Sequence, residues 1–228
     1  MNRGELTANG VRLSFLEEGD AGEPVVLLLH GLPSDATTWE HTMSGLAPTH
    51  HAYALDQRGQ GRSDWPGEYS FELMRDDVLG FADGLGLREV TLVGHSAGGT
   101  VACLVAQERP SWLARLVVED SPPPRPGAFV IPVPDRPEHE LDYDWPVMPS
   151  LLRQLNEPDP AWWERLAEIA VPTLLISGGA TSPLPVGLAA EAVARIPDAK
   201  LVTIEAGHQV HRVRPEEFLA ELRAFLPL

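Results

Sequence analysis

Cysteine, basic residues and long apolar runs are all scarce in this sequence of 228 residues. Cys103 is the only cysteine, so no intrachain disulfide can form and nothing points to an oxidising compartment. The 17 lysines and arginines face 33 acidic residues, and the net charge of -16 without any basic run argues against partners such as nucleic acid or an anionic membrane. The longest aliphatic stretch, 25–29, is far shorter than the roughly 18 residues of a membrane span, and the N-terminus has no signal-peptide core. These absences favour a cytoplasmic location.

The order of apolar runs predicts an α/β fold within one domain, residues 1–228. A chain of this length suits one sizeable core. After a hairpin at Asn9-Gly10, buried-type strands alternate with stretches of helical periodicity, the last of them at 186–195 and 215–225. This alternation is typical of a mostly parallel central sheet flanked by helices.

One segment, 121–165, departs from this alternation. Half of the 22 prolines lie between residues 122 and 160, with a short helix expected only near 150–155. Aromatic and aliphatic residues are interleaved among these prolines, which favours a packed flap over a disordered linker.

The chain is organised around residues 89–109, where an apolar run ends in Gly94-His95-Ser96-Ala97-Gly98 and a helix of small residues follows. This is the G-x-S-x-G pattern of a nucleophile elbow. The serine stands on a strained strand-to-helix turn, and glycines two residues to either side remove the Cβ atoms that would collide there. Ser96 is therefore the candidate nucleophile.

A serine hydroxyl needs a base within hydrogen-bond reach, and His208 is the strongest of the eight histidines. It follows the last predicted strand, which in a parallel sheet brings it to the same carboxyl edge as Ser96. We expect His211 to support the same loop, and His95 and His30 to pack or hydrogen-bond beside the site. The four remaining histidines have no such position in the sequence and are assigned to the surface or to packing: His41, His50, His51 and His139.

The negatively charged oxygen of an acyl intermediate needs two preorganised donors. The N–H of Ala97 begins the helix after the nucleophile and supplies one of them. The N–H of Leu32 is placed for the second, because Gly31 allows a tight turn and Pro33 has no N–H. These two residues form the predicted oxyanion hole.

At this point the chain resembles the α/β-hydrolase fold superfamily. The matching stretches are HGLPSDATTW at 30–39, DQRGQGRSD at 56–64, GHSAGG at 94–99, VPTLLISGG at 171–179 and AGHQVHRVRPEEF at 206–218. The resemblance implies the α/β-hydrolase fold, Ser96 as nucleophile, His208 as base, and neither a cofactor nor a metal. The flap at 121–165 stands where relatives carry a larger cap.

Two departures from the family concern the site. Gln60 and Ala97 stand where many relatives have histidine and a larger residue, which predicts an open pocket. No carboxylate follows the strand at 171–178, where the family usually places the triad's acid. Because some relatives, notably haloalkane dehalogenases, carry this acid after the strand that ends at Glu119, we assign it to Asp120. Glu119 is the alternative, since strand alternation lets only one of the two point inward.

These residues predict a cofactor-independent serine hydrolase of carboxylic esters or lactones that forms an acyl-enzyme. Its partner would be a small-molecule acyl substrate, and the chain would act as a monomer or homodimer. A perhydrolase, peptidase or C–C bond hydrolase could use the same triad, and a ligand-binding protein with little turnover is the alternative from another class. The residues expected to contact substrate, besides Leu32, are Gly31, Trp39, His95, Trp145 and Val147.

Overall fold

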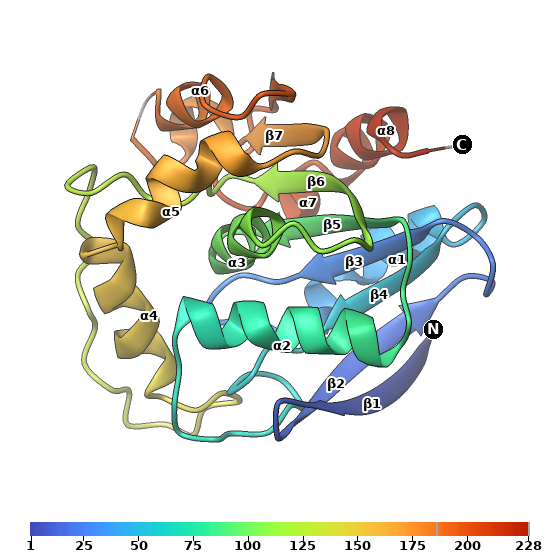
Figure 1. Cartoon of the computed structure of the whole chain (residues 1–228). Helices are drawn as coiled ribbons and strands as arrows, with labels where there is room; N and C mark the ends of the chain where they lie inside the picture. The colour runs from blue at the N-terminus through green and yellow to red at the C-terminus, as the bar shows by residue number, and fades with distance from the viewer. Residues whose placement is uncertain (186, 228) are drawn as a thin grey trace.

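An eight-stranded sheet runs through the centre of the molecule in the order β1-β2-β4-β3-β5-β6-β7-β8. The computed structural model describes residues 1–185 and 187–227 (Figure 1). The first hairpin pairs antiparallel, β2 also pairs antiparallel with β4, and every other neighbouring pair is parallel. The predicted α/β class and mostly parallel sheet are thus confirmed. The strands are β1 (Asn2–Ala8), β2 (Val11–Glu18), β3 (Val25–Leu29), β4 (His51–Leu55), β5 (Val90–His95), β6 (Leu113–Glu119), β7 (Thr173–Ser177) and β8 (Ala199–Thr203).

Helices cover both faces of this sheet (Figure 1). One core lies under α2 and α3 and a second lies under α1 and α8, on the opposite face. Helix α2 illustrates the local cause, because Ser70 caps its N-terminus and Phe71, Met74, Val78 and Phe81 bury one side. The α-helices are α1 (Glu40–Leu46), α2 (Phe71–Gly84), α3 (Ala97–Gln107), α4 (Val147–Asn156), α5 (Pro160–Glu164), α6 (Leu188–Val193), α7 (Val210–Val213) and α8 (Pro215–Phe225).

The last two predicted helices correspond to α6 and α8. Helix α8 has the predicted bounds, whereas α6 covers Leu188–Val193 of the predicted 186–195, and residue 186 lies outside the described residues. Among the described residues, no helix is both long and apolar enough to cross a bilayer.

The connection from β6 to β7 carries the flap beyond the carboxyl ends of the parallel strands (Figure 1). Its first part, 121–146, has no helix or strand, but it is tied to the 56–64 loop by the bridge between Gln60 and Tyr143 and by the Asp144 N–H donating to the Gly59 carbonyl at 2.7 Å. Helix α4 begins at Val147, earlier than predicted, because Pro149 falls in its first turn, where no N–H is needed.

Candidate active site

Ser96 lies between the end of β5 and the start of α3, in a strained backbone conformation with φ 53° and ψ -124°. A Cβ atom at Gly94 would lie 2.2 Å from the Gly98 carbonyl oxygen. One at Gly98 would lie 2.5 Å from the carbonyl oxygens of Leu29 and His30. Both glycines are therefore required by crowding at the turn that exposes the serine.

A chain of hydrogen bonds links Ser96 to His208 and His208 to Asp120. The Nε2 atom of His208 is 2.8 Å from Ser96 Oγ, and its Nδ1 atom is 2.8 Å from Asp120 Oδ2. Because the carboxylate only accepts, Nδ1 carries the proton and Nε2 is free to accept the one from the serine. The Asp120 side chain is almost fully buried, whereas a third of the His208 side chain is exposed to substrate and solvent.

The loop after β7, which lacks the family's usual acid, instead supplies donors to Asp120. The N–H of Gly178 donates to Asp120 Oδ1 at 2.8 Å, and the hydroxyl of Ser182 donates to Oδ2 at 2.7 Å. Asp120 itself has a positive φ of 47°, which turns its side chain off the end of β6. Two donors from this loop therefore hold the carboxylate in the place from which it reaches His208.

The alternative acid, Glu119, faces a different histidine. Its carboxylate oxygens lie 2.8 and 2.9 Å from Nδ1 of His211, and Oε1 also accepts the His211 backbone N–H at 2.9 Å. Glu119 is the last residue of β6 and points to one face of the sheet, whereas Asp120 follows the strand with a φ of 47° and turns its side chain in another direction. Of the two predicted carboxylates, only Asp120 contacts His208.

The N–H groups of Leu32 and Ala97 have no hydrogen-bond partner within the described part of the chain. Ala97 is the first residue of α3, so its N–H belongs to the free end of the helix, which favours negative charge. Both residues line the pocket in which Ser96 and His208 are exposed. Unpaired backbone donors beside a nucleophile are the elements of an oxyanion hole.

The pocket at Ser96 has a volume of about 320 Å³ and is mostly apolar. The first part of the flap, 121–146, forms one wall, and α4 of the same flap forms another with side chains at the helical spacing i, i+4, i+7. Besides Leu32, Ser96, Ala97 and His208, its lining residues are Ile131, Pro132, Pro134, Met148, Leu152 and Leu155.

The five further residues predicted to contact substrate are not among the residues that line this pocket. Trp39 is fully buried on the other face of the sheet, where it packs on His211 and Phe218. Val147 is fully buried in the main core, on the side of the sheet covered by α2 and α3, and Trp145 is half-buried beside Tyr143.

Gly31 and His95 lie behind the nucleophile and out of the pocket. A Cβ atom at Gly31 would come within 2.9 Å of both His95 Nδ1 and Ser96 Cβ. Gly31 therefore serves close backbone approach, as its role in the turn predicts. The lining residues that sequence reasoning missed could be found only in α4, through the helical spacing of Met148, Leu152 and Leu155.

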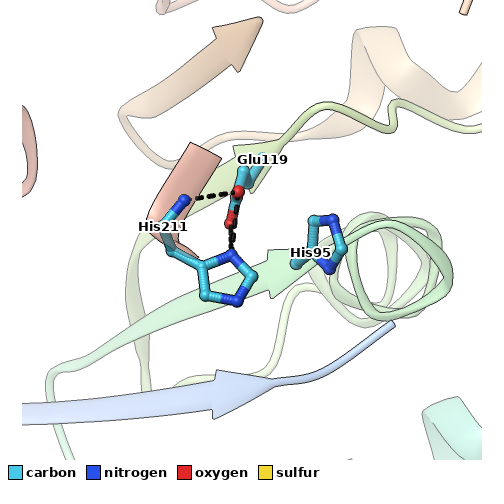
Figure 2. A group of neighbouring side chains, drawn as sticks. All are labelled: His95, Glu119 and His211. Carbon is cyan, nitrogen blue, oxygen red and sulfur yellow. Dashed lines mark hydrogen bonds and ion pairs between the residues drawn. The ribbon is translucent and has the colours of Figure 1, made fainter. Parts of the chain in front are cut away.

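A second group of titratable side chains, His95, Glu119 and His211, lies close together and buried (Figure 2). Burial alone would raise the pKa of Glu119, but the neighbouring His95 and His211 lower it on balance. Burial lowers the pKa of His95 to about 4, so this ring is neutral at pH 7.

Two histidines and one carboxylate are a familiar ligand set for transition metals. Here, however, Glu119 and His211 are already joined by direct hydrogen bonds, and His95 Nε2 lies 2.7 Å from the His208 carbonyl oxygen. A carbonyl only accepts, so this nitrogen carries a proton and cannot bind an ion. The contacts thus join Glu119 to His211, and His95 to the backbone of His208.

Comparison with known proteins places this geometry in a family. A family model described as the alpha/beta hydrolase fold matches residues 24–165. Epoxide hydrolase 3 of Xenopus tropicalis is 30% identical over 65% of this chain and 42% of its own length, and epoxide hydrolase 4 of Mus musculus is 34% identical over 51% and 33%. The matched part of the chain thus spans less than half the length of these relatives.

Other similar proteins match along nearly the whole chain. The sn-1-specific diacylglycerol lipase ABHD11 of Mus musculus is 26% identical over 92% of this chain and 83% of its own length. Among solved structures, a thermophilic esterase from Thermogutta terrifontis has a TM-score of 0.82 at 24% identity and covers 99% of this chain and 98% of its own. The enol-lactonase from Burkholderia xenovorans LB400 has a TM-score of 0.81 at 20% identity, with 97% and 99% covered. At such identities the structures show a shared fold.

Proposed function

Because the chain belongs to the alpha/beta hydrolase fold family, we propose that it is a serine hydrolase that cleaves carboxylic esters or lactones without a cofactor. The observation that carries the proposal is the unbroken series of contacts from Asp120 through His208 to Ser96, beside two unpaired N–H groups. A nucleophile, a base, a group that orients the base and an oxyanion hole are the parts that acyl transfer requires.

In the proposed mechanism His208 removes the proton of Ser96 as the serine oxygen attacks the carbonyl carbon of the ester. The N–H groups of Leu32 and Ala97 stabilise the tetrahedral oxyanion, and Asp120 stabilises the imidazolium. The imidazolium then protonates the leaving alcohol, which departs and leaves an ester of Ser96. His208 then deprotonates a water molecule as it attacks the acyl-enzyme, and the resulting imidazolium returns this proton to Ser96 Oγ, so that the acid is released and the serine regenerated.

The pocket supports neutral, partly apolar acyl groups as substrates. Aside from His208, none of the described residues that line it carries an ionisable side chain. A substrate with a carboxylate or phosphate in its acyl part would lose hydration there without gaining a partner. The net charge of -16 opposes approach of such anions as well.

Some relatives are named epoxide hydrolases, but a serine at the nucleophile position favours esters over epoxides as substrates of this chain. An epoxide opened by Ser96 would leave an alkyl ether on the serine, with no carbonyl carbon for water to attack. Turnover of such a species by the same base has no route. A ligand-binding protein without turnover would be expected if the carboxylate that orients the base had been lost. Asp120 supplies this carboxylate to His208, so the contact argues against that alternative.

Hydrolysis of p-nitrophenyl esters of two to twelve acyl carbons, with dissolved substrate and with triglyceride emulsions, tests the proposal. We expect turnover of dissolved short and medium esters, unchanged by a metal chelator. Absence of turnover on every ester and lactone tried would refute it. A steep preference for emulsions would identify a lipase, and loss of activity on chelation would contradict a cofactor-independent mechanism.

A further inference from the structure

The buried residues His95, Glu119 and His211 lie close in sequence to the three residues of the proposed triad. His95 directly precedes Ser96, Glu119 directly precedes Asp120, and His211 follows three residues after His208, in α7. His95 and Glu119 are also register partners on β5 and β6, so their side chains share one face of the sheet. The ends of β5 and β6 and the segment after β8 thus each carry one residue of the proposed triad and one residue of the buried group.

Glu119 holds one side of the loop that carries His208. Its carboxylate accepts the backbone N–H and the Nδ1–H of His211, the second residue of α7. The fully buried carboxylate thus accepts two donors of one residue, with the Nδ1–H shared by both of its oxygens, and this restricts where the loop can lie. On its other ring nitrogen, His211 lies 2.8 Å from the hydroxyl of Thr38, which fixes the ring from the far side.

His95 holds the other side of this loop. Its Nε2–H donates to the backbone carbonyl of His208 at 2.7 Å, and its ring lies between those of His208 and His211, with centroids 4.9 Å from each. The residue that must present its imidazole to Ser96 is therefore held through its own backbone. Figure 2 shows the three side chains at the ends of their elements.

We propose that Glu119 is a positioning residue. It acts through His211, and together with the bond from His95 to the His208 backbone it holds the His208 imidazole in line between Ser96 and Asp120. The proposal rests on the proposed function for its effect on catalysis, but its effect on the loop is independent of that function. None of the three side chains lines the substrate pocket, so weakened positioning lowers kcat and leaves KM nearly unchanged.

Two variants loosen the network in different ways. Glu119→Gln keeps the shape but can accept only one of the His211 donors well, because its amide nitrogen faces the other. His211→Phe removes the ring donors and keeps an aromatic ring against Trp39 and Phe218. Asp77→Asn is the control, since it also weakens a buried carboxylate pair, with Arg58, without touching the His208 loop.

The test combines ester kinetics with amide hydrogen exchange of the peptide 205–214, measured at a temperature at which every variant is folded. We expect Glu119→Gln and His211→Phe to lower kcat about tenfold with KM within twofold, and to speed exchange in this peptide about tenfold. Asp77→Asn should leave both unchanged. Normal kcat and normal exchange in the two network variants, with only a loss of thermal stability, would overturn the proposal.

If the wild type hydrolyses no ester, the proposed function fails, and the exchange result alone decides on positioning. Faster exchange in the network variants would then still support it, and unchanged exchange would still overturn it.

Discussion

Two acid–imidazole pairs sit side by side in this fold, and they differ mainly in what surrounds them. The pair of Asp120 and His208 opens onto the apolar pocket, and its imidazole reaches a serine hydroxyl. The pair of Glu119 and His211 has almost no exposed side-chain surface, and its imidazole reaches the hydroxyl of Thr38 instead of a nucleophile in a pocket. The two acids are adjacent in sequence, yet one pair has the contacts of a candidate catalyst and the other those of a fixed support. The surroundings of an acid–imidazole pair, and not its chemical groups, make this difference.

The largest expected effect concerns the nucleophile of the exposed pair. Ser96→Ala should lower kcat for ester hydrolysis by at least ~10³-fold and up to ~10⁶-fold, as in triads where the serine is removed, because the serine acts only in the transition state. Thermal unfolding should be unchanged. Activity within tenfold of the wild type would show that another group attacks the ester.

The next effect separates the two acids. Asp120→Asn should lower kcat about 10⁴-fold, because the imidazole then takes the wrong tautomer. Glu119→Gln, the matched change on the adjacent residue, should cost only about tenfold. Initial rates with p-nitrophenyl butyrate measure both. If Asp120→Asn keeps more than a tenth of the wild-type kcat, the assignment of the acid is wrong.

The losses in stability of these two variants should follow the opposite order to their losses in kcat. Glu119→Gln removes the charge of a buried carboxylate, and no water can take its place as the partner of His211. We expect it to lower the free energy of unfolding by about 3 kcal/mol. Asp120 is also buried, but it has two donors from the loop after β7 besides His208, so Asp120→Asn should cost less. Urea denaturation of the two variants measures the difference. Equal losses would contradict the division into catalyst and support.

Acid should weaken the buried group first. The pKa of His95 is about 4 in the folded protein, below the ordinary histidine value of about 6.5, so the unfolded chain takes up a proton that the folded one refuses. Stability should therefore fall by about 3 kcal/mol between pH 6.5 and pH 4 from this residue. The lowered pKa of Glu119 adds a further loss only below about pH 4.5.

Replacing His95 checks the origin of this loss. His95→Gln retains a donor for the His208 carbonyl but cannot titrate, so its unfolding free energy should fall less than that of the wild type over the same pH range. Urea midpoints between pH 7 and pH 4 provide the comparison. Identical pH slopes in the two proteins would assign the acid sensitivity to other groups.

The smallest effect should come from the loop that supports Asp120. Ser182→Ala removes one hydrogen bond to the Oδ2 atom that His208 also contacts, while the Gly178 N–H still holds Oδ1. A single such bond is worth about 1 kcal/mol, so kcat should fall by a factor of about 3 to 10. A loss as large as that of Asp120→Asn would mean that Ser182 does more than orient the acid.

The sequence predicted the sheet and the strand-end residues because both depend on local pattern. Buried runs mark the strands, and the carboxyl edge of a parallel sheet brings together Ser96, Asp120 and His208 from distant parts of the chain. The contribution of Ser182 was not predictable, because its partner lies 62 residues away and a serine in a loop carries no pattern.

The pocket was predicted poorly for a related reason. Trp39 and Val147 are large and apolar near the site in sequence, but such residues are more often core than lining. The segment 121–146 lacks any periodicity from which its inward side chains could be identified. Only α4 shows a usable signal, and its first turn was not recognised as helical.

The most direct measurement of the central claim is labelling of the wild type with a fluorophosphonate, followed by intact mass and peptide mapping. An activated serine attacks phosphorus and becomes covalently modified, whereas ordinary serines do not react. The account predicts one adduct per chain, located on Ser96, with labelling slowed strongly in Asp120→Asn and only mildly in Glu119→Gln. No adduct on the wild type, or an adduct on a different serine, would contradict it.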